Sequence, residues 1–360
     1  MTRTVAVSLD QFYRPQPGGI STYVRGLVRG LASLGDEAPT LVGLAPRGRA
    51  TREVSDLTLA RVDAPLGVAA LTRAWAYWPL AVPAGCDVVH ATSLAGPFGG
   101  GRRGAVHSVA LHDLLWRDEP DASTPRGRRF HESRLRLLRR REDVRVLTTA
   151  PGLDRRLVAD GFAPSRLFAV GLGVDEGVAS AEGPDVVVRF LNERGVRGPF
   201  TLYVGTREPR KNLARLRRAH ALARATHGEL GPLVVAGPPG WGAQDDGDAV
   251  VLGLVSRELL RGLYRDAAVF AYVPRAEGFG LPPVEALHAG ARVVASVTTP
   301  SVADNADVVR VDPFDVDAIA SGLVAALSLA HDDAARQRRR ASVASMTWRN
   351  VALQHLAAWR

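Results

Sequence analysis

Short apolar runs recur along the chain, and most are followed by a loop and then an amphipathic helical segment. The runs are continuous rather than alternating, which is typical of parallel strands buried on both faces. In the first half, strands are predicted at Val5–Leu9, Leu41–Ala45, Val88–Thr92, Val106–Leu111, Val144–Thr148 and Leu167–Gly171. In the second half, they are predicted at Phe200–Val204, Leu233–Ala236, Val250–Leu252, Val269–Val273, Val293–Ser296 and Val308–Val311. Strands that alternate with helices indicate an α/β fold.

Predicted helical segments alternate with the strands in both halves of the chain. They are predicted at Ser21–Leu34, Arg128–Arg141, Leu213–Thr226, Arg257–Asp266, Pro283–Ala289 and Val316–Leu329. A chain of 360 residues has room for two domains of ordinary size, so we expect two doubly wound, Rossmann-like domains. The boundary should follow Gly173-Val174-Asp175, where a Gly/Ala/Asp-rich stretch begins. We therefore expect domains over residues 1–175 and 185–343, with ligands in a cleft at the carboxyl ends of the strands.

Composition excludes several classes of protein. Hydrophobic residues make up 46% of the chain and charged residues 23%, which is globular composition. No apolar run is long enough for a transmembrane helix, and the run Met1–Asp10 lacks the features of a signal peptide. The single cysteine, Cys86, rules out an internal disulfide and a cysteine metal cluster. We expect a cytoplasmic, bacterial protein.

The basic residues are almost all arginine. Among the 46 lysines and arginines the one lysine is Lys211, and the net charge is +9. Such a bias reflects a GC-rich genome, in which arginine replaces lysine wherever either cation will serve. Because the two side chains are not interchangeable, a surviving lysine indicates either chance or a site that needs a compact ammonium group.

The strongest motif is Glu277-Gly-Phe-Gly-Leu-Pro-Pro-Val-Glu285, which follows an apolar strand and opens a helix. Prolines suit a first helical turn, and Gly278 and Gly280 let the backbone approach a ligand closely. Free amides at a helix N-terminus attract phosphate. Glu285 can accept hydrogen bonds from the hydroxyls of a ribose, and Glu277 from a sugar hydroxyl. An ordinary strand–loop–helix connection explains these nine residues less well.

A second motif, Tyr203-Val-Gly-Thr-Arg-Glu-Pro-Arg-Lys-Asn212, also follows a strand and leads into a helix. Arg207, Arg210 and Lys211 place cations where a diphosphate could be neutralised. Negative charge grows on a leaving diphosphate, so fixed cations stabilise the transition state more than the ground state. A merely solvated basic helix start is unfavourable, because cations oppose the dipole at that end.

These two segments resemble the retaining GT-B glycosyltransferases of family 4, with their "GT-x-x-P-R-K-N" loop and E-x7-E motif. Further matches span the chain, and they are Pro17-Gly18-Gly19-Ile20, Val89-His90-Ala91, His112-Asp113, Gly173-Val174-Asp175, Val311-Asp312-Pro313 and Met346-Thr347-Trp348. The resemblance implies two Rossmann-like domains facing each other across a cleft. It also implies a last helix, over residues 344–360, that crosses back onto the first domain.

The resemblance further implies a nucleotide-sugar donor held mainly by the second domain, with no metal. Lys211 should bind the donor diphosphate, Glu285 the ribose and Glu277 the transferred sugar. The remaining donor contacts should come from Thr206, Arg207, Arg210, Leu254, Val255, Gly278, Phe279, Gly280 and Leu281. Leu254 and Val255 should lie near the nucleobase, through backbone contacts.

In the first domain, the resemblance implies that Gly18 and Gly19 form a loop that closes over the diphosphate. His112 should lie beside the donor sugar, although a structural histidine is the alternative. His90 and Asp113 are candidates to face the acceptor, and His90 could equally be a packed histidine at the end of its strand. We take His112, Lys211 and Glu277 as the candidate catalytic residues.

The chain also departs from the family pattern. Thr206 stands where a second basic residue often follows the glycine, so Arg207 or Arg210 must replace it. Arg292 stands where proline is frequent, and Ser301 where glutamate is frequent. Arg275 replaces a usual serine. These departures concern the sugar pocket rather than the donor-binding scaffold.

The mechanism implied by the resemblance needs no metal, since a donor phosphate oxygen takes the acceptor proton. The acceptor would be a hydroxyl of a glycan, a lipid-linked sugar or a small molecule. The expected donor is GDP-mannose, with UDP- and dTDP-sugars as open alternatives. The alternatives are a non-catalytic GT-B partner subunit, a dehydrogenase, for which Gly-x-Gly-x-x-Gly is missing after the first strand, and an epimerase or phosphorylase.

The segment Arg126–Arg141 carries eight arginines. One hypothesis is a surface helix that docks on anionic lipid, which would place the protein peripherally on the inner face of the membrane. The other is an ordinary helix in an arginine-rich protein, which the sequence slightly favours. We expect no nucleic-acid partner, because no fold that binds nucleic acid is recognised.

Overall fold

The structure is a computed structural model, and it describes residues 3–14, 18–50, 54, 57, 59–99, 104–174, 182–240 and 247–360. Two expected motif residues, Pro17 and Asp175, lie outside the described residues. The chain forms two compact units. The N-terminal unit comprises residues 1–175 and 346–360, and the C-terminal unit comprises residues 176–345.

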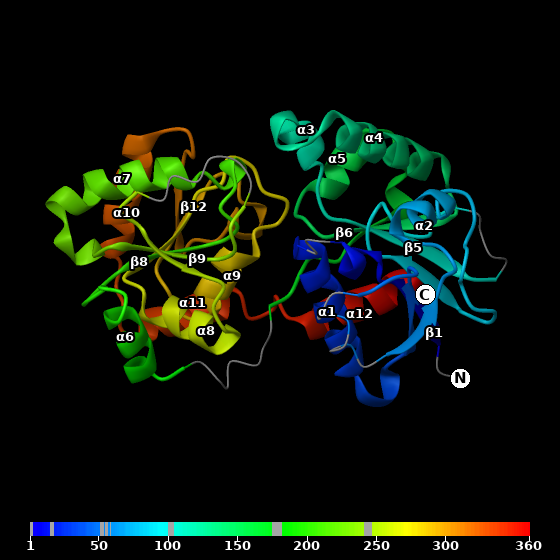
Figure 1. Ribbon diagram of the computed structural model, residues 1–360, viewed down its shortest axis with the longest axis horizontal. Helices are drawn as coiled ribbons and strands as arrows, with labels where there is room; N and C mark the ends of the chain where they lie inside the picture. The colour runs from blue at the N-terminus through cyan, green and yellow to red at the C-terminus, as the bar shows by residue number, and fades with distance from the viewer. Residues whose placement is uncertain are drawn as a thin grey trace. The chain divides into compact units, whose positions relative to one another are not determined.

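The described residues of the N-terminal unit build a parallel sheet in the order β3-β2-β1-β4-β5-β6-β7 (Figure 1). The strands are β1 (Thr4–Ser8), β2 (Thr40–Ala45), β3 (Ala60–Asp63), β4 (Val88–Ala91), β5 (Val106–Leu111), β6 (Val144–Thr148) and β7 (Leu167–Ala169). Strand β3 was not predicted, because it is a short edge strand with half its residues polar and none buried.

Helices cover this sheet. They are α1 (Gly18–Ala32), α2 (Val68–Ala74), α3 (Leu115–Asp118), α4 (Pro125–Arg140), α5 (Leu153–Ala159) and α12 (Trp348–Trp359). Short 3-10 turns lie at Asp10–Tyr13, Gly35–Glu37, Pro120–Ala122 and Pro164–Arg166. Helix α4 begins at Pro125 because Thr124 caps it, its hydroxyl accepting a hydrogen bond from the amide of Gly127.

The last helix, α12, packs against the first, α1, and two glycines of α1 permit it. A Cβ atom on Gly26 would lie 2.0 Å from the indole of Trp348, and one on Gly30 would lie 2.1 Å from the Trp348 carbonyl oxygen. The amide of Val174 also donates a hydrogen bond to the carbonyl of Met346 at 2.9 Å. The chain's last residues therefore belong to the unit in which the chain begins.

The C-terminal unit has the same plan. Its sheet is parallel, with the order β10-β9-β8-β11-β12-β13 among the described residues. The strands are β8 (Thr201–Val204), β9 (Leu233–Ala236), β10 (Val250–Gly253), β11 (Val269–Tyr272), β12 (Val293–Ser296) and β13 (Val308–Val311). All six were predicted to within about one residue, since each is a continuous apolar run.

The helices of this unit are α6 (Pro184–Asn192), α7 (Leu213–Thr226), α8 (Arg257–Asp266), α9 (Leu281–His288), α10 (Val316–Leu327) and α11 (Asp333–Ser342). Further 3-10 turns lie at Pro209–Lys211, Gly228–Leu230 and Pro300–Val302. Helices α6 and α11 were not predicted as helices. Helix α6 is only nine residues long, and of its five apolar residues it buries only Val187 and Leu191.

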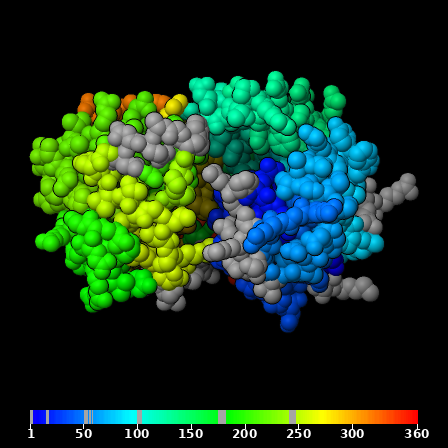
Figure 2. Space-filling view, viewed as in Figure 1, coloured from blue at the N-terminus to red at the C-terminus, as the bar shows by residue number. Residues whose placement is uncertain are grey.

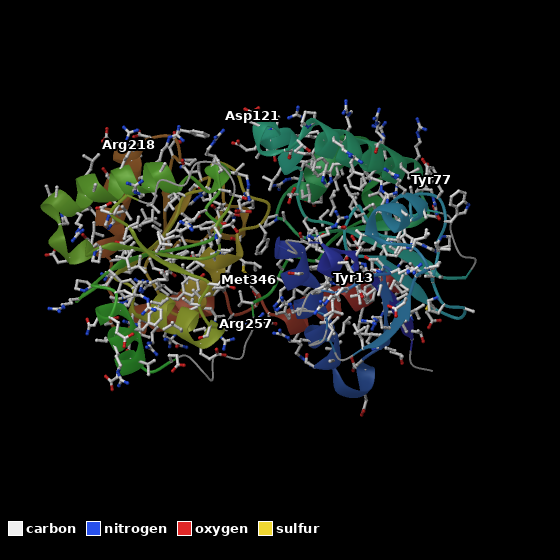
Figure 3. The ribbon with its side chains drawn as sticks, viewed as in Figure 1. Tyr13, Tyr77, Asp121, Arg218, Arg257 and Met346 are labelled. Atoms are coloured by element: carbon white, nitrogen blue, oxygen red, sulfur yellow. The ribbon has the colours of Figure 1, made fainter. Side chains whose placement is uncertain are left out.

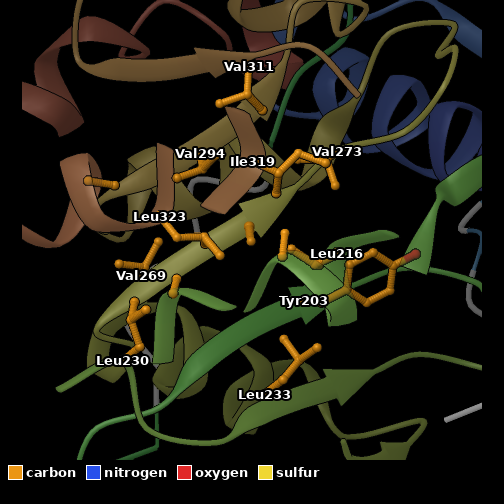
Figure 4. Packing of buried hydrophobic residues seen from close by; sticks show 14 of the residues in the cluster. Tyr203, Leu216, Leu230, Leu233, Val269, Val273, Val294, Val311, Ile319 and Leu323 are labelled. Carbon is orange, nitrogen blue, oxygen red and sulfur yellow. The ribbon is translucent and has the colours of Figure 1, made fainter. Parts of the chain in front are cut away.

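The core of the C-terminal unit lies between the sheet and helices α7 and α10. Figure 4 shows Ile319 and Leu323 of α10 packing over Val294 of β12 and Val269 of β11. Leu216 of α7 belongs to the same cluster and is fully buried. This packing holds β11 and its neighbours rigidly, and so it fixes where the loops that follow the strands begin.

Within the part of the chain that the structure describes, each helix is too short or too polar to span a bilayer.

Candidate functional site

The two motifs of the C-terminal unit meet because of the strand order. Strands β8 and β11 are neighbours, with Thr201 opposite Val269 and Leu202 opposite Phe270. The order of the strands reverses at this point in the sheet, where open α/β sheets bind their ligands. The loops that follow β8 and β11 contact each other, since the amide of Arg275 donates to the carbonyl of Arg210 at 2.9 Å.

Asn212 fixes the end of the first loop. Its backbone is left-handed, with φ of 64°, and its buried side-chain amide donates to the carbonyls of Val273 (2.9 Å) and Pro313 (2.7 Å). These bonds tie the loop after β8 to the ends of β11 and β13. The neighbouring Lys211 is thereby aimed at the carboxyl edge of the sheet.

Lys211 and Glu277 form the centre of the site. The ammonium nitrogen of Lys211 lies 2.5 Å from Oε2 of Glu277 and 2.6 Å from the hydroxyl of Tyr272. That hydroxyl also donates to Oε2 of Glu277 at 2.6 Å. A guanidinium nitrogen of Arg210 lies 3.3 Å from the same oxygen, and Arg210 also pairs with Glu208 at 2.6 Å. Two cations and a phenol therefore converge on one carboxylate.

These contacts set the protonation states. Burial alone would raise the pKa of Glu277, but Lys211 and Arg210 hold it at about 2. Burial and the neighbouring Glu277 raise the pKa of Tyr272 well above its usual value. Glu277 is therefore an anion and Tyr272 a neutral donor near neutral pH. The side chains of Lys211 and Glu277 are 14% and 11% exposed, so both can still meet a ligand.

Hydrogen bonds from neighbouring residues fix the loop that runs from Glu277 into α9. Oε1 of Glu277 accepts a hydrogen bond from the amide of Gly278 at 3.1 Å. Gly280 is left-handed, with φ of 90°, and a Cβ atom there would lie 2.6 Å from Thr299. Ser301 binds the loop through its hydroxyl, which donates to the Gly280 carbonyl (2.6 Å), and through its amide, which donates to the Phe279 carbonyl (2.9 Å). The first amides of α9 follow directly.

Glu285 lies two residues further into α9 than expected. We predicted a helix start at Pro283, which would put Glu285 in the first turn, but α9 begins at Leu281 because Gly280 makes the turn. Glu285 is consequently in the second turn. Its Oε2 accepts a hydrogen bond from the buried hydroxyl of Tyr264 at 2.9 Å, and the side chain is half-buried.

Four other residues that were predicted to bind the nucleotide-sugar donor lie at the same edge of the sheet. Thr206 and Arg207 follow β8, and the Thr206 carbonyl accepts a bond from the Tyr203 hydroxyl at 3.3 Å. Leu254 and Val255 follow β10, and Leu254 is 78% exposed. A Cβ atom on Gly237, after β9, would lie 2.3 Å from the Gly205 carbonyl, so the loops after β8 and β9 also touch.

In the N-terminal unit, Gly18 and Gly19 are the first residues of α1 and both are exposed. Gly18 has φ of 61°, and a Cβ atom on either glycine would meet nothing within 4 Å. The carbonyl of Gly18 accepts a bond from the Ser21 hydroxyl at 2.7 Å. Because neither glycine has a side chain, the backbone at the start of α1 is exposed at these two positions.

His112 follows β5 and its ring is held at both nitrogens. Nε2 lies 2.9 Å from the carbonyl of Thr92, which can only accept, so Nε2 carries the hydrogen. Nδ1 then accepts from the Thr149 hydroxyl at 3.2 Å. Burial lowers the pKa of His112, so the ring is neutral. Asp113 accepts a bond from the amide of Leu115 at 3.0 Å.

His90 does not face an acceptor, and this part of the prediction is wrong. The side chain is fully buried, with Nε2 2.7 Å from the Tyr23 hydroxyl and Nδ1 2.9 Å from the Ser108 hydroxyl. Its ring is covered by α1 and α12, since it contacts Tyr23 of α1 and both His355 and Trp359 of α12. The alternative, a packed histidine at the end of its strand, is what the structure has.

Three residues of the site were missed from the sequence. Asn212 was inside a recognised motif but was read as a helix start, and Tyr272 was read only as part of the strand Val269–Val273. Ser301 was read as a departure from the family pattern, although it is the residue that anchors the Phe279–Gly280 loop. Among the described residues, no three histidine, cysteine or carboxylate side chains are grouped as a metal site requires.

Comparison with known families agrees with both units. A family model described as "Glycosyl transferase 4-like domain" matches residues 18–173, and one described as "Glycosyl transferases group 1" matches residues 198–328. The chain belongs to the group 1 glycosyltransferases. Both matched regions contain the predicted site residues of their unit, from Gly18 to His112 in the first and from Thr206 to Glu285 in the second. A glycosyltransferase is an enzyme, so a non-catalytic partner subunit is not favoured.

A curated relative and several solved structures resemble this glycosyltransferase. The chain is 36% identical over 179 residues to O-antigen chain mannosyltransferase B of Escherichia coli, a match that spans 45% of each chain. HepE of Anabaena, solved with UDP and glucose, has a TM-score of 0.69 at 14% identity, over 99% of this chain and 98% of that one. Sucrose-phosphate synthase of Thermosynechococcus elongatus has a TM-score of 0.73 at 19% identity, with the same coverage. These structures show that the glycosyltransferase has the two-domain GT-B fold.

Proposed function

We propose that the protein transfers a sugar from a nucleotide-sugar donor to an acceptor hydroxyl, with retention of the anomeric configuration and without a metal. The observation that carries the proposal is the Lys211–Glu277 pair at the junction of β8 and β11. Lys211 has three hydrogen-bond donors, and Tyr272 and Glu277 take two of them. The third is available to a diphosphate oxygen.

The groups around this pair take the remaining parts of the donor. The amides at the start of α9 and the guanidinium groups of Arg207 and Arg210 supply further positive potential for the diphosphate. Oε1 of Glu277, which accepts from the Gly278 amide, can also accept a hydrogen bond from a hydroxyl of the transferred sugar. Glu285 receives the ribose, with Tyr264 holding its other oxygen.

The reaction then balances without a protein nucleophile. The bond between the anomeric carbon and the diphosphate oxygen breaks, and the acceptor oxygen forms its bond to carbon on the same face. The acceptor proton passes to the departing diphosphate oxygen. Lys211 and Arg210 stabilise the charge that develops there, which exceeds the charge in the ground state. For the N-terminal unit, we assign Gly18 and Gly19 to the diphosphate and His112 to the sugar from the family resemblance alone.

GDP-mannose is the donor we propose. The curated relative is named a mannosyltransferase, and the match to it covers less than half of each chain. The acceptor we propose is a sugar hydroxyl of a glycan, for the same reason. HepE was solved with UDP, which makes UDP the competing nucleotide.

A calorimetric titration with GDP, UDP, ADP and dTDP tests the proposal on wild type, Lys211→Ala and Arg218→Ala. Arg218 is an exposed cation on α7, and it controls for the loss of one charge in the same unit. We expect GDP to bind, Lys211→Ala to weaken it by about tenfold or more, and Arg218→Ala to leave it unchanged. If UDP binds in place of GDP, the proposed donor becomes a UDP-sugar. If no nucleotide binds, the proposed donor site is refuted.

A second measurement tests the stereochemistry. With the donor identified, proton NMR of the product at early time reports its anomeric configuration. Retention supports the proposed same-face reaction, and inversion would overturn it whichever nucleotide binds.

A further inference from the structure

Helix α4 carries most of the eight arginines of residues 126–141, and four of the eight are used within the fold. Arg134 is buried, donates to the Thr72 carbonyl at 2.7 Å and stacks over Phe98. Arg128 donates to the carbonyls of Pro120 and Ser123, and Arg139 donates to the carbonyl of Asp160. Arg141 forms a bidentate pair with Asp143. Contacts within the fold therefore account for these four arginines.

The other four form a single stripe. Arg126, Arg129, Arg136 and Arg140 are spaced by three, seven and four residues, and Ser133 occupies the gap. At about 100° per residue, these five positions fall within a sector of about 80° on the helix. All five are exposed, whereas Leu135 and Leu138 on the opposite side are buried. The stripe is about 21 Å long.

The stripe keeps its charge. In the described part of the chain, no carboxylate forms an ion pair with Arg126, Arg129 or Arg140. Glu132 lies beside the stripe, but its two oxygens bind Arg117 at 2.5 and 2.9 Å, and one also accepts from the Trp116 indole at 2.6 Å. Its charge is thus opposed mainly by Arg117, outside the stripe, and in part by Arg136 of the stripe.

A hollow opens on the same face. It has a volume of about 480 Å³ and is lined by Trp116, Arg128, Arg129, Glu132 and Arg136. Figure 2 shows the teal segment that contains α4 at the surface of the N-terminal unit, and in Figure 3 side chains with blue nitrogen atoms project from α4 away from the unit. Two arginines of the stripe therefore border a hollow large enough for a phosphate group.

We propose that this face of α4 docks on an anionic lipid bilayer, with a lipid phosphate in the hollow between Arg129 and Arg136. A straight row of arginines on a convex helix matches a plane of negative charge, and the row contains no apolar side chain to insert. The contact is therefore electrostatic and peripheral. It uses no residue of the donor site, so it stands or falls independently of the proposed donor.

Co-sedimentation with vesicles tests the proposal at low salt. The probes are phosphatidylcholine vesicles, with and without about one third phosphatidylglycerol, a fraction chosen to give a strongly negative surface. The stripe variant is R126Q/R129Q/R140Q. The matched control, R189Q/R197Q/R218Q, removes three exposed arginines from the C-terminal unit, so net charge changes equally. Circular dichroism and thermal unfolding of each variant verify that it is folded.

We expect wild type to bind the anionic vesicles and not the neutral ones. The stripe variant should bind about tenfold more weakly, while the control should change little, and salt at about 0.5 M should release the protein. Two outcomes would overturn the proposal. They are no binding to anionic vesicles, or an equal loss of binding in the stripe variant and the control.

Discussion

The hydroxyl of Tyr23 lies 2.7 Å from Nε2 of His355, although 332 residues separate the two in the chain. Tyr23 is on α1 and His355 on α12, and both are fully buried. Nδ1 of His355 lies 2.7 Å from the Val351 carbonyl and must donate to it. Neutral His355 therefore accepts at Nε2, and Tyr23 is the donor.

The rest of the network follows from that bond. The oxygen of Tyr23 accepts from Nε2 of His90, and Nδ1 of His90 accepts from the Ser108 hydroxyl at 2.9 Å. The Ser108 oxygen accepts from the Trp359 indole at 2.9 Å. A chain of hydrogen bonds thus starts and ends on α12 and has every proton assigned. It requires both histidines to be neutral.

This network predicts a pH dependence of stability. Burial lowers the pKa of His355 to about 4, below its value of about 6.5 in an unfolded chain. The unfolded chain therefore takes up the proton first as the pH falls. The free energy of unfolding should decline between about pH 6.5 and 4, by on the order of 3 kcal/mol from this residue.

Urea unfolding of wild type and His355→Gln over that pH range measures the effect. The variant should be less stable at neutral pH, because the flexible glutamine amide replaces a ring that bonds Tyr23 and the Val351 carbonyl at the same time. Its stability should also depend less on pH than that of wild type. Identical slopes for the two proteins would mean that His355 does not titrate in this way.

Glu277→Gln should separate catalysis from nucleotide binding. The neutral amide removes the anion that orients Lys211 and that faces the sugar, while Lys211 and Arg210 remain for the diphosphate. We expect kcat to fall by about 100-fold or more and nucleotide affinity to change far less. Steady-state kinetics and calorimetry measure the two, with Glu229→Gln, an exposed carboxylate, as the control. Full activity in Glu277→Gln would contradict the assigned role.

Gly280→Ala should disturb the start of α9. The residue is left-handed and its Cβ atom would lie 2.6 Å from Thr299, so the loop must shift. We expect a loss of about 1–3 kcal/mol in unfolding free energy and a higher KM for the donor. Gly228→Ala is the matched control, since a Cβ atom there meets nothing within 4 Å. The idea fails if the two variants are equally stable and bind donor equally well.

Activity should survive removal of divalent metal ions. In the proposed mechanism, Lys211, Arg210 and the amides of α9 take the place that a cation would have at the diphosphate. Initial rates after treatment with EDTA, and again with excess Mg²⁺, should agree to within about a factor of two, because the developing charge is already matched. A rate that vanishes with EDTA and returns with Mg²⁺ would refute metal independence.

Much of the C-terminal unit could be predicted from the sequence. Its six strands are continuous valine- and alanine-rich runs, and a parallel sheet buried on both faces demands such runs. The two motifs were recognised because glycine, proline and charged residues at the end of a strand have few structural explanations. Strand β3 and helix α6 were missed, because a short edge element buries too little apolar surface to leave a pattern.

Local sequence patterns could not predict which residues stabilise the site, because those residues act through contacts with distant parts of the chain. Asn212 acts through carbonyls of Val273 and Pro313, which are 61 and 101 residues away, and Ser301 acts through the Gly280 carbonyl. His90 carried the same signal as a functional histidine, a polar residue at a strand end. Only its burial under α1 and α12 distinguishes the two roles.

The sequence by itself determined the fold class, the family resemblance and the two loops that carry Lys211 and Glu277, because local runs and short motifs encode all three. Tertiary structure decided which side chains meet. The order of the strands places β8 beside β11 and so makes an ion pair from residues 66 positions apart. It also decided which arginines of α4 are structural and which keep their charge at the surface, since burial and hydrogen bonding depend on neighbours that the sequence does not place.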